Sequence, residues 1–221
     1  MKSINERKEN KVLLLCNMGK LHEVAGSVYD VCQRFICKRV IALQKFLRDD
    51  AINADNNNNI RLYFIYDKEV KMLAGYYTLT STCMLRKAED GAKENTKYEF
   101  EKIVSKVVPS IEIEHFALND EYLKWLKRNG YNNKGIGYFI YQQYVKNTII
   151  AALENIAFSY VILHAYKHDK VIDAYRNMGF ETYEDDKENI IPILDGLTPI
   201  RGDYADTCKF MYQSIEDILL Y

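Results

Sequence analysis

Runs of apolar positions divide the first half of the chain into short elements. An apolar run at 12–16 predicts a strand, and apolar positions at helical spacing over 22–49 predict two helices or one bent helix. Two β-rich runs follow at 61–66 and 71–83. The residues between these two runs, Asp67-Lys68-Glu69, are typical of a hairpin turn.

Strand and helix patterns alternate in the second half of the chain. Gly130 and Gly179 stand where two predicted helices should end, because glycine readily adopts the left-handed conformation found there. The predicted elements are, in order, a strand at 111–118, a helix at 119–128, a long helix from Gly135, a strand at 159–166, a helix at 168–178 and strands at 190–194 and 207–214. This order predicts an α/β (α+β) fold with a mixed sheet.

Three polar stretches interrupt these patterns. Residues 1–10 predict a polar N-terminal tail, and the asparagine run at 56–59 predicts a turn. Residues 86–108 are highly charged and predict a polar insertion or loop. We expect residues 1–221 to form a single domain, because this length suits one domain with insertions.

Composition and charge narrow the class of protein. Hydrophobic residues make up 48% of the chain, which is enough for a full core. The formal net charge is −1, so the chain as a whole lacks the basic field that drives nonspecific nucleic-acid binding. The polar N-terminus lacks the apolar core of a signal peptide, and the apolar run near it is too short to span a bilayer. We therefore expect a cytoplasmic protein with no membrane contact.

The cysteines predict neither disulfides nor a metal site. There are five of them, and none lies in a C-x-x-C spacing. An odd number without such spacing is typical of reduced thiols in the cytosol. We expect no metal cofactor.

The clearest chemical signal is a strand followed by Gly135-Ile136-Gly137 at the start of a helix. Glycines let the backbone approach a ligand closely, and the free N–H groups of a first helical turn attract phosphate. Lys134 adds a positive charge beside them. A dinucleotide fingerprint would need a third glycine where Ile140 stands, and no P-loop sequence occurs in the chain.

Several short motifs resemble those of the GNAT superfamily, the GCN-related N-acetyltransferases. They occur in the family's order and cover about residues 60–215. They are a third-strand run at 74–79, a fourth strand at 111–118 with Phe116-Ala117-Leu118 in place of Leu-Ala-Val, a pyrophosphate loop at 132–137, the run Ala174-Tyr175-Arg176-Asn177-Met178-Gly179-Phe180, and a closing strand at 208–212.

The resemblance implies a single mixed, mostly antiparallel sheet flanked by helices, as in GNAT proteins. It also implies transfer of an acetyl or other acyl group from acetyl-CoA to a primary amine by direct attack, with no metal. The cofactor-binding residues that it implies are Phe116, Ala117, Leu118, Asn132, Asn133, Lys134, Gly135, Ile136 and Gly137.

Two departures from the family pattern stand out. Asn132 replaces the usual Gln or Arg at the first loop position, which removes one long side-chain contact to the pyrophosphate. About a dozen residues, 120–131, separate the strand from the loop, and they predict a short extra helix.

By the same resemblance, Glu112 is the expected base that takes the proton of the amine, and Tyr175 is the expected donor to the departing thiolate. Glu114 lies two residues after Glu112 and therefore on the same face of a strand, where like charges raise one pKa. Glu114 is the alternative base. The simplest alternative to base catalysis is that both carboxylates face solvent or attract a cationic substrate. The expected oxyanion donor is a backbone N–H within 116–118.

Other polar side chains carry weaker signals. His115 is on the opposite face from Glu112 in a regular strand, and a packed, hydrogen-bonded histidine is the expectation. His164 and His168 flank the next strand, near where an acceptor could bind. Cys37 and Cys83 lack a histidine partner in the sequence pattern, so a cysteine nucleophile is a poor alternative mechanism.

Three functions fit these residues. The leading one is acetylation of a small-molecule or peptide amine. A toxin-like GNAT acting on aminoacyl-tRNA is the second, suggested by the run 75–79 and the polar stretch before Pro109, and the net charge of −1 does not favour it. The third is a non-catalytic acyl-CoA-binding module, which the change at Asn132 favours. The sequence neither requires nor excludes a homodimer.

Overall fold

The computed structural model describes residues 3–87, 104–182, 190–192 and 207–220. The strands are β1 (Leu13–Cys16), β2 (Arg61–Asp67), β3 (Met72–Lys87), β4 (Val104–Leu118), β5 (Tyr160–Tyr166), β6 (Glu181–Thr182), β7 (Ile190–Pro192) and β8 (Cys208–Ser214). The helices are α1 (Ile4–Glu9), α2 (Met18–Ala25), α3 (Val28–Gln33), α4 (Ile41–Lys45), α5 (Ala51–Asn56), α7 (Asp120–Arg128), α8 (Ile136–Ile140), α9 (Lys146–Leu153), α10 (Asp169–Asn177) and α12 (Ile215–Leu220), with π-helical turns η1 (Phe46–Asp50) and η2 (Tyr141–Val145).

The strands form one mixed sheet in the order β1-β2-β3-β4-β5-β8-β6, with β7 paired to β3. Strands β1, β2 and β3 pair in antiparallel fashion, as do β5, β8 and β6. The pairing of β4 with β5 is parallel. The predicted fold class, a single mixed and mostly antiparallel sheet flanked by helices, is confirmed.

Contacts divide the chain into two compact units. The first, called unit 1, comprises Met1–Thr80 and Ile113–Val145, and the second, called unit 2, comprises Ser81–Glu112 and Lys146–Tyr221. The long strands β3 and β4 contribute to both units.

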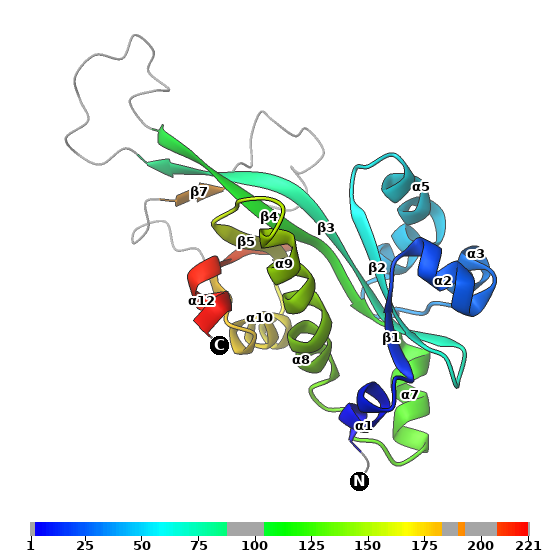
Figure 1. Cartoon of the computed structure of the whole chain (residues 1–221). Helices are drawn as coiled ribbons and strands as arrows, with labels where there is room; N and C mark the ends of the chain where they lie inside the picture. The colour runs from blue at the N-terminus through cyan, green and yellow to red at the C-terminus, as the bar shows by residue number, and fades with distance from the viewer. Residues whose placement is uncertain (1–2, 88–103, 183–189, 193–206, 221) are drawn as a thin grey trace. The chain divides into compact units, whose positions relative to one another are not determined.

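Unit 1 has a core between its strands and the helices α2, α3 and α5, which lie beside β2 in Figure 1. Asn17 and Ser27 cap α2 and α3 by accepting hydrogen bonds from backbone N–H groups of the first turns, as these residue types commonly do. The buried core residues include Leu21, Phe35, Leu47, Phe64, Tyr76 and Ala117. The segment 22–49 thus folds into more short helices than the pattern predicted.

A close approach of β3 and β4 in unit 1 requires a glycine. An ideal Cβ on Gly75 would lie 2.6 Å from the carbonyl oxygen of Ala117, a distance that real Cβ atoms essentially never show. Just beyond, the Asn119 N–H donates to the carbonyl of Ala74 at 2.9 Å. Gly75 therefore sets how tightly the end of β4 packs on β3.

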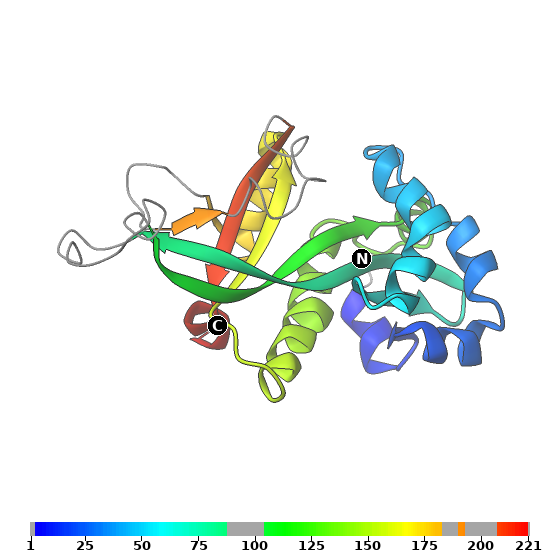
Figure 2. The ribbon, with the colours of Figure 1, turned by 90° about the horizontal axis from the view of Figure 1, so that it is seen from above.

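Unit 2 is built on β5 and β8, which lie side by side in Figure 2. Helix α10 packs against β5, and Gly179 follows its C-cap residue Met178 with a φ of 98°, the left-handed conformation expected of a glycine after a helix. An ideal Cβ on Gly179 would lie 2.4 Å from a side-chain atom of Gln213 on β8. Glycine at this position thus satisfies both the backbone turn and the packing.

Several boundaries differ from the predicted ones. The predicted polar tail at 1–10 contains helix α1, which has a capping box formed by Ser3 and Glu6 and a buried Arg7. Strand β4 begins at Val104 and runs through Pro109, and the unpredicted α12 follows β8.

Parts of two other predictions lie outside the described residues. Of the predicted polar segment 86–108, residues 88–103 lie outside them, whereas its flanks belong to β3 and β4. Of the predicted strand at 190–194, only residues 190–192 are described. Within the described part of the chain, no helix is long and apolar enough to cross a membrane.

Candidate active site

The predicted phosphate loop is a tight connection between α7 and α8 in unit 1. Helix α7 is the predicted extra helix, and Gly130 after it has a φ of 79°. Gly135 is the N-cap of α8, with φ 74° and ψ 10°, and its carbonyl accepts from the Phe139 N–H at 2.9 Å. The N–H groups of the first turn, which include that of Gly137, are therefore oriented along the helix axis towards the loop.

The details of this loop fit an anion. An ideal Cβ on Gly135 would meet no atom within 4 Å, so the backbone is open to a ligand there. Lys134 is exposed beside it and supplies a positive charge. The partial positive charge of the helix N-terminus adds to that of Lys134, and both favour a phosphate or pyrophosphate.

Asn132, which departs from the family pattern, has a structural role inside the loop. Its Oδ1 accepts a hydrogen bond from the Lys134 N–H at 3.0 Å, which closes a small turn inside the loop. The side chain thus holds the loop in shape instead of reaching outward as a Gln or Arg would. Asn133, Ile136 and Gly137 complete the predicted loop, and their contacts with a cofactor remain a prediction.

The end of β4 carries the other predicted cofactor residues, Phe116, Ala117 and Leu118. Among the described residues, the parallel ladder between β4 and β5 covers Ser110–Glu112 opposite Tyr160–Ile162, whereas β4 continues to Leu118. The backbone of 113–118 thus extends beyond that ladder. A backbone N–H within 116–118 as the oxyanion donor stays a prediction.

Glu112 is buried in unit 2 and faces a histidine. Its carboxylate is 3% exposed, and its Oε1 lies 3.2 Å from Nδ1 of His164, which is 8% exposed. The Glu112 carboxylate therefore does not face solvent. The alternative of a solvent-exposed carboxylate is wrong for Glu112. A buried carboxylate needs hydrogen-bonding partners, and His164 is one partner of Glu112.

The Glu112–His164 pair was missed from the sequence. The two residues are joined by strand register: Glu112 on β4 lies opposite Ile162 on β5, and His164 follows two positions later on the same face. The His164 ring also meets Phe210 of β8 edge-on, at 5.4 Å between centroids. Only knowledge that β4 and β5 pair in parallel, in this register, could have brought these residues together.

The other two strand residues differ from Glu112 in their surroundings. Glu114 is partly buried in unit 1. His115 is the packed, hydrogen-bonded histidine that was expected: its Nδ1 lies 3.0 Å from the hydroxyl of Thr78, and its ring stacks on Phe46 at 3.7 Å. His168 caps α10 by accepting from the Lys170 N–H at 3.3 Å.

Tyr175 lies half-buried on α10 in unit 2. Its ring meets Phe180 edge-on at 5.9 Å between centroids. Burial, and then the negative charge that Cys208 would carry, raises the pKa of the Tyr175 phenol well above its ordinary value. The phenol therefore stays protonated at neutral pH and can donate a hydrogen bond.

The buried cysteines offer little nucleophilic chemistry. All five are free thiols. Burial raises the pKa of Cys37 above its ordinary value and that of Cys32 to about 12. A buried thiol with a raised pKa is not the thiolate that attacks a substrate.

Comparison with solved structures identifies the fold, whereas comparison of sequences identifies no family. No protein-family model matches the chain, and no curated protein matches it. Solved structures do resemble it. AtaTR bound with acetyl-CoA is 20% identical with a TM-score of 0.63, covering 95% of this chain and 98% of that one.

Two further similar structures involve AtaT. A tyrosine-to-phenylalanine variant of the AtaT toxin, bound to the C-terminus of the antitoxin AtaR and acetyl-CoA, is 19% identical with a TM-score of 0.58 over 95% of this chain and 97% of that one. AtaT complexed with acetyl-methionyl-tRNAfMet is 22% identical with a TM-score of 0.55 over 81% and 94%. At these identities the likeness shows the fold, and the predicted GNAT-like architecture is confirmed.

Proposed function

We propose that this protein is an acetyl-CoA-dependent N-acetyltransferase whose acceptor is the α-amino group of an aminoacyl-tRNA. The observation that carries the proposal is the likeness, over 95% of the chain, to AtaTR bound with acetyl-CoA. The open, glycine-capped loop at Gly135 supports the cofactor, since it offers backbone N–H groups to a pyrophosphate. The likeness to AtaT complexed with acetyl-methionyl-tRNAfMet supports the acceptor.

The distribution of charge also supports an RNA acceptor. Unit 1 contains 17 Lys and Arg against 12 Asp and Glu, a formal charge of +5, whereas unit 2 contains 13 against 19, a charge of −6. The net charge of −1 therefore hides a basic unit that includes the proposed cofactor loop. That net charge was the reason not to favour a tRNA acceptor. The expected small-molecule or peptide acceptor gains no support from the similar structures.

Part of the positive charge in unit 1 gathers around helix α7. The pKa of the exposed Glu121 carboxyl lies below its ordinary value, first because of its hydrogen bond to Lys124 and then because of the charges of Lys38 and Arg128. The exposed cations on α7, together with one that acts on Glu121 from outside it, are Lys124, Lys127, Arg128 and Lys38. Such a cluster suits the phosphates of an RNA backbone.

An α-amine is also the acceptor that demands least of the buried Glu112. An α-amino group has a pKa of about 7.7–8.0, against about 10.4 for a lysine side chain, so a sizeable fraction is neutral at pH 7. The Glu112–His164 pair then has only to hold or relay a proton. Acetyl-CoA, when bound, supplies the acetyl group as a thioester, and Tyr175 would donate a hydrogen bond to the departing sulfur.

The test compares acceptors with the same purified protein and radiolabelled acetyl-CoA. We expect label in aminoacyl-tRNA, with no label in uncharged tRNA or in aminoacyl-tRNA whose amine is already formylated. A panel of free amino acids and polyamines completes the comparison. If label appeared in the small amines alone, the proposed tRNA acceptor would be wrong, and the expectation of a small-molecule or peptide acceptor would stand.

A non-catalytic acyl-CoA-binding module is the alternative from another class. The hydrogen bond from the Lys134 N–H to Asn132 weakens the argument for it, because that asparagine has a structural role in the loop. Tight acetyl-CoA binding without acetylation of any acceptor would favour the module. Absence of acetyl-CoA binding would reject both functions.

A further inference from the structure

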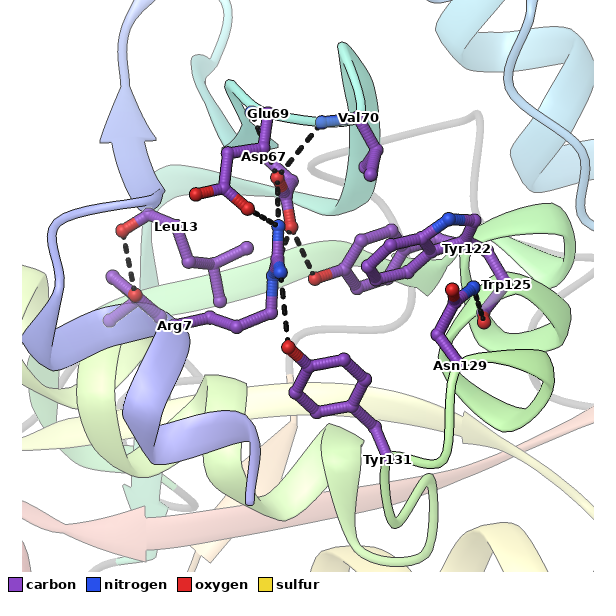
Figure 3. Close-up of polar contacts among 10 residues, drawn as sticks. Arg7, Leu13, Asp67, Glu69, Val70, Tyr122, Trp125, Asn129 and Tyr131 are labelled. Carbon is purple, nitrogen blue, oxygen red and sulfur yellow. Dashed lines mark hydrogen bonds and ion pairs between the residues drawn. The ribbon is translucent and has the colours of Figure 1, made fainter. Parts of the chain in front are cut away.

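A buried ion pair ties the N-terminal helix to the rest of unit 1 (Figure 3). Nε and Nη2 of Arg7 on α1 each donate to a carboxylate oxygen of Asp67 at 2.7 Å, which makes a bidentate pair. Glu69 accepts from Nη2 at 3.0 Å. The Arg7 side chain is 6% exposed and that of Asp67 is 0% exposed. Two parallel charge-assisted hydrogen bonds of this kind fix the guanidinium in one orientation.

The guanidinium also contacts the segment that leads into the cofactor loop. Nη1 of Arg7 donates to the hydroxyl of Tyr131 at 3.3 Å, and Tyr131 directly precedes Asn132. The guanidinium carbon lies 4.9 Å from the ring centroid of Trp125 and 5.6 Å from that of Tyr131. These two rings stack on each other at 5.8 Å, so Tyr131 is held by both its ring and its hydroxyl (Figure 3).

The same N-terminal segment also contacts the π-helical turn η2, which follows helix α8. Lys8, next to Arg7, donates to the side chain of Gln143 in η2. The hydroxyl of buried Tyr144 donates to the backbone carbonyl of Leu13 at 3.2 Å. Residues 7–13 thus contact the chain both just before the loop and after the helix that the loop opens.

The charge on Arg7 is secured by its partners. Burial lowers its pKa, but the hydrogen bonds to Asp67 and Tyr131 and the charge of Asp67 outweigh burial and raise the pKa above its ordinary value. Asp67 has a second fixed contact, because the hydroxyl of Tyr122 donates to its Oδ2 at 2.8 Å. Two tyrosine hydroxyls therefore meet this ion pair, and only that of Tyr131 belongs to the segment entering the loop.

We infer that Arg7 is a positioning residue for the cofactor loop and acts on it through Tyr131. The identity of the loop's ligand as acetyl-CoA rests on the proposed function, whereas the bracing of the loop does not. The loop offers its N–H groups to an anion, so its shape before binding governs affinity. Loss of the brace should loosen residues 132–137 while leaving the core of unit 1 folded.

The test compares two matched variants, Tyr131→Phe and Tyr122→Phe. Each removes one hydroxyl from the same ion pair and keeps the ring. We expect Tyr131→Phe to speed amide hydrogen exchange at 132–137 in the ligand-free protein and to raise the acetyl-CoA Kd about fivefold, the size of the net contribution of one ordinary hydrogen bond. Tyr122→Phe should lower the unfolding midpoint but leave loop exchange and Kd unchanged.

A double-mutant cycle then tests whether Arg7 acts through Tyr131. Arg7→Lys keeps the charge but loses the planar fork, and it should raise Kd in the wild type and have little further effect in Tyr131→Phe. Additive effects, or equal loop exchange in Tyr131→Phe and Tyr122→Phe, would overturn the inference. A wild type that fails to bind acetyl-CoA would reject the proposed function alone, because the exchange comparison needs no ligand.

Discussion

The surroundings of Tyr175 keep its phenol protonated. Burial raises the pKa of its phenol above the ordinary value, so the proton stays on the oxygen as pH rises through 7 to about 10. A thiol such as that of CoA has a pKa of about 8.5, lower than that of the phenol. If Tyr175 contacts the leaving sulfur, as we propose, full proton transfer to the thiolate would be uphill, and a strong hydrogen bond would be the greater contribution.

Tyr175→Phe should lower kcat by about 10²-fold while the acetyl-CoA Kd hardly changes, because only the leaving group loses a donor. Tyr29→Phe, at a position 60% exposed in unit 1, is the control and should match the wild type. A fall in wild-type rate between pH 8 and 10 must come from another group. A kcat for Tyr175→Phe within about twofold of the wild type would leave Tyr175 with a packing role against Phe180.

Glu112 and His164 make a second prediction at the residue scale. If the pair handles the proton as a unit, Glu112→Gln and His164→Gln should each lower kcat at neutral pH, and the double variant should be no slower than either. The rate of Glu112→Gln should recover partly at high pH, where the acceptor amine is neutral without help. Glu114→Gln, two residues along the same strand, should have a smaller effect.

The measurement for this pair is a pH–rate profile of the four variants on aminoacyl-tRNA. Multiplied losses in the double variant would mean that the two side chains act separately. A profile of Glu112→Gln equal to that of the wild type would remove Glu112 from proton handling. The 3.2 Å contact to His164 would then serve to stabilise buried polar groups.

At the scale of elements, the sequence predicts those turns, helices and caps that depend on residues close together in the chain. The hairpin at Asp67, helix α7 and the glycine N-cap of α8 all follow from turn residues and periodicity within a few positions. The prediction of a polar tail in place of helix α1 overlooked a local signal, the capping box of Ser3 and Glu6. The burial of Arg7 could not be predicted locally, because its partner lies 60 residues away. The pairing of Glu112 with His164 likewise depends on strand register, which no local pattern contains.

The glycine-capped start of α8 yields the third prediction. Gly137→Val places a branched side chain on the first turn, where a pyrophosphate would approach the N–H groups, and should weaken acetyl-CoA binding at least about tenfold. Gly19→Ala in α2 is a suitable control, since its Cβ would meet only Asn17 at 3.7 Å. Calorimetry on both folded variants provides the comparison, and an unchanged affinity in Gly137→Val would remove this loop from the cofactor site.

For the whole molecule, the net charge does not reveal that positive and negative residues are divided unequally between the two units. This division becomes visible only when the fold assigns each residue to a unit. A formal charge of +5 on unit 1 and −6 on unit 2 cancels almost completely in the sequence total. A ligand that carries many phosphates responds to the local field within a Debye length of about 8 Å, so the total says little about it. The charge division favours an acceptor that binds through its phosphates.

If tRNA binds through the basic unit, its affinity should fall steeply with salt, and removing a cation that binds a phosphate should lower the slope of log K against log salt by about one. Lys127→Ala and Arg128→Ala on α7 should together weaken tRNA binding, flatten that slope and leave the acetyl-CoA Kd unchanged. Lys170→Ala removes an exposed cation from unit 2 and serves as the control. The measurement is a set of binding isotherms at several salt concentrations. An equal slope in all variants would mean that the RNA binds elsewhere. A flattened slope with intact acetyl-CoA binding would mean that α7 contacts the RNA phosphates.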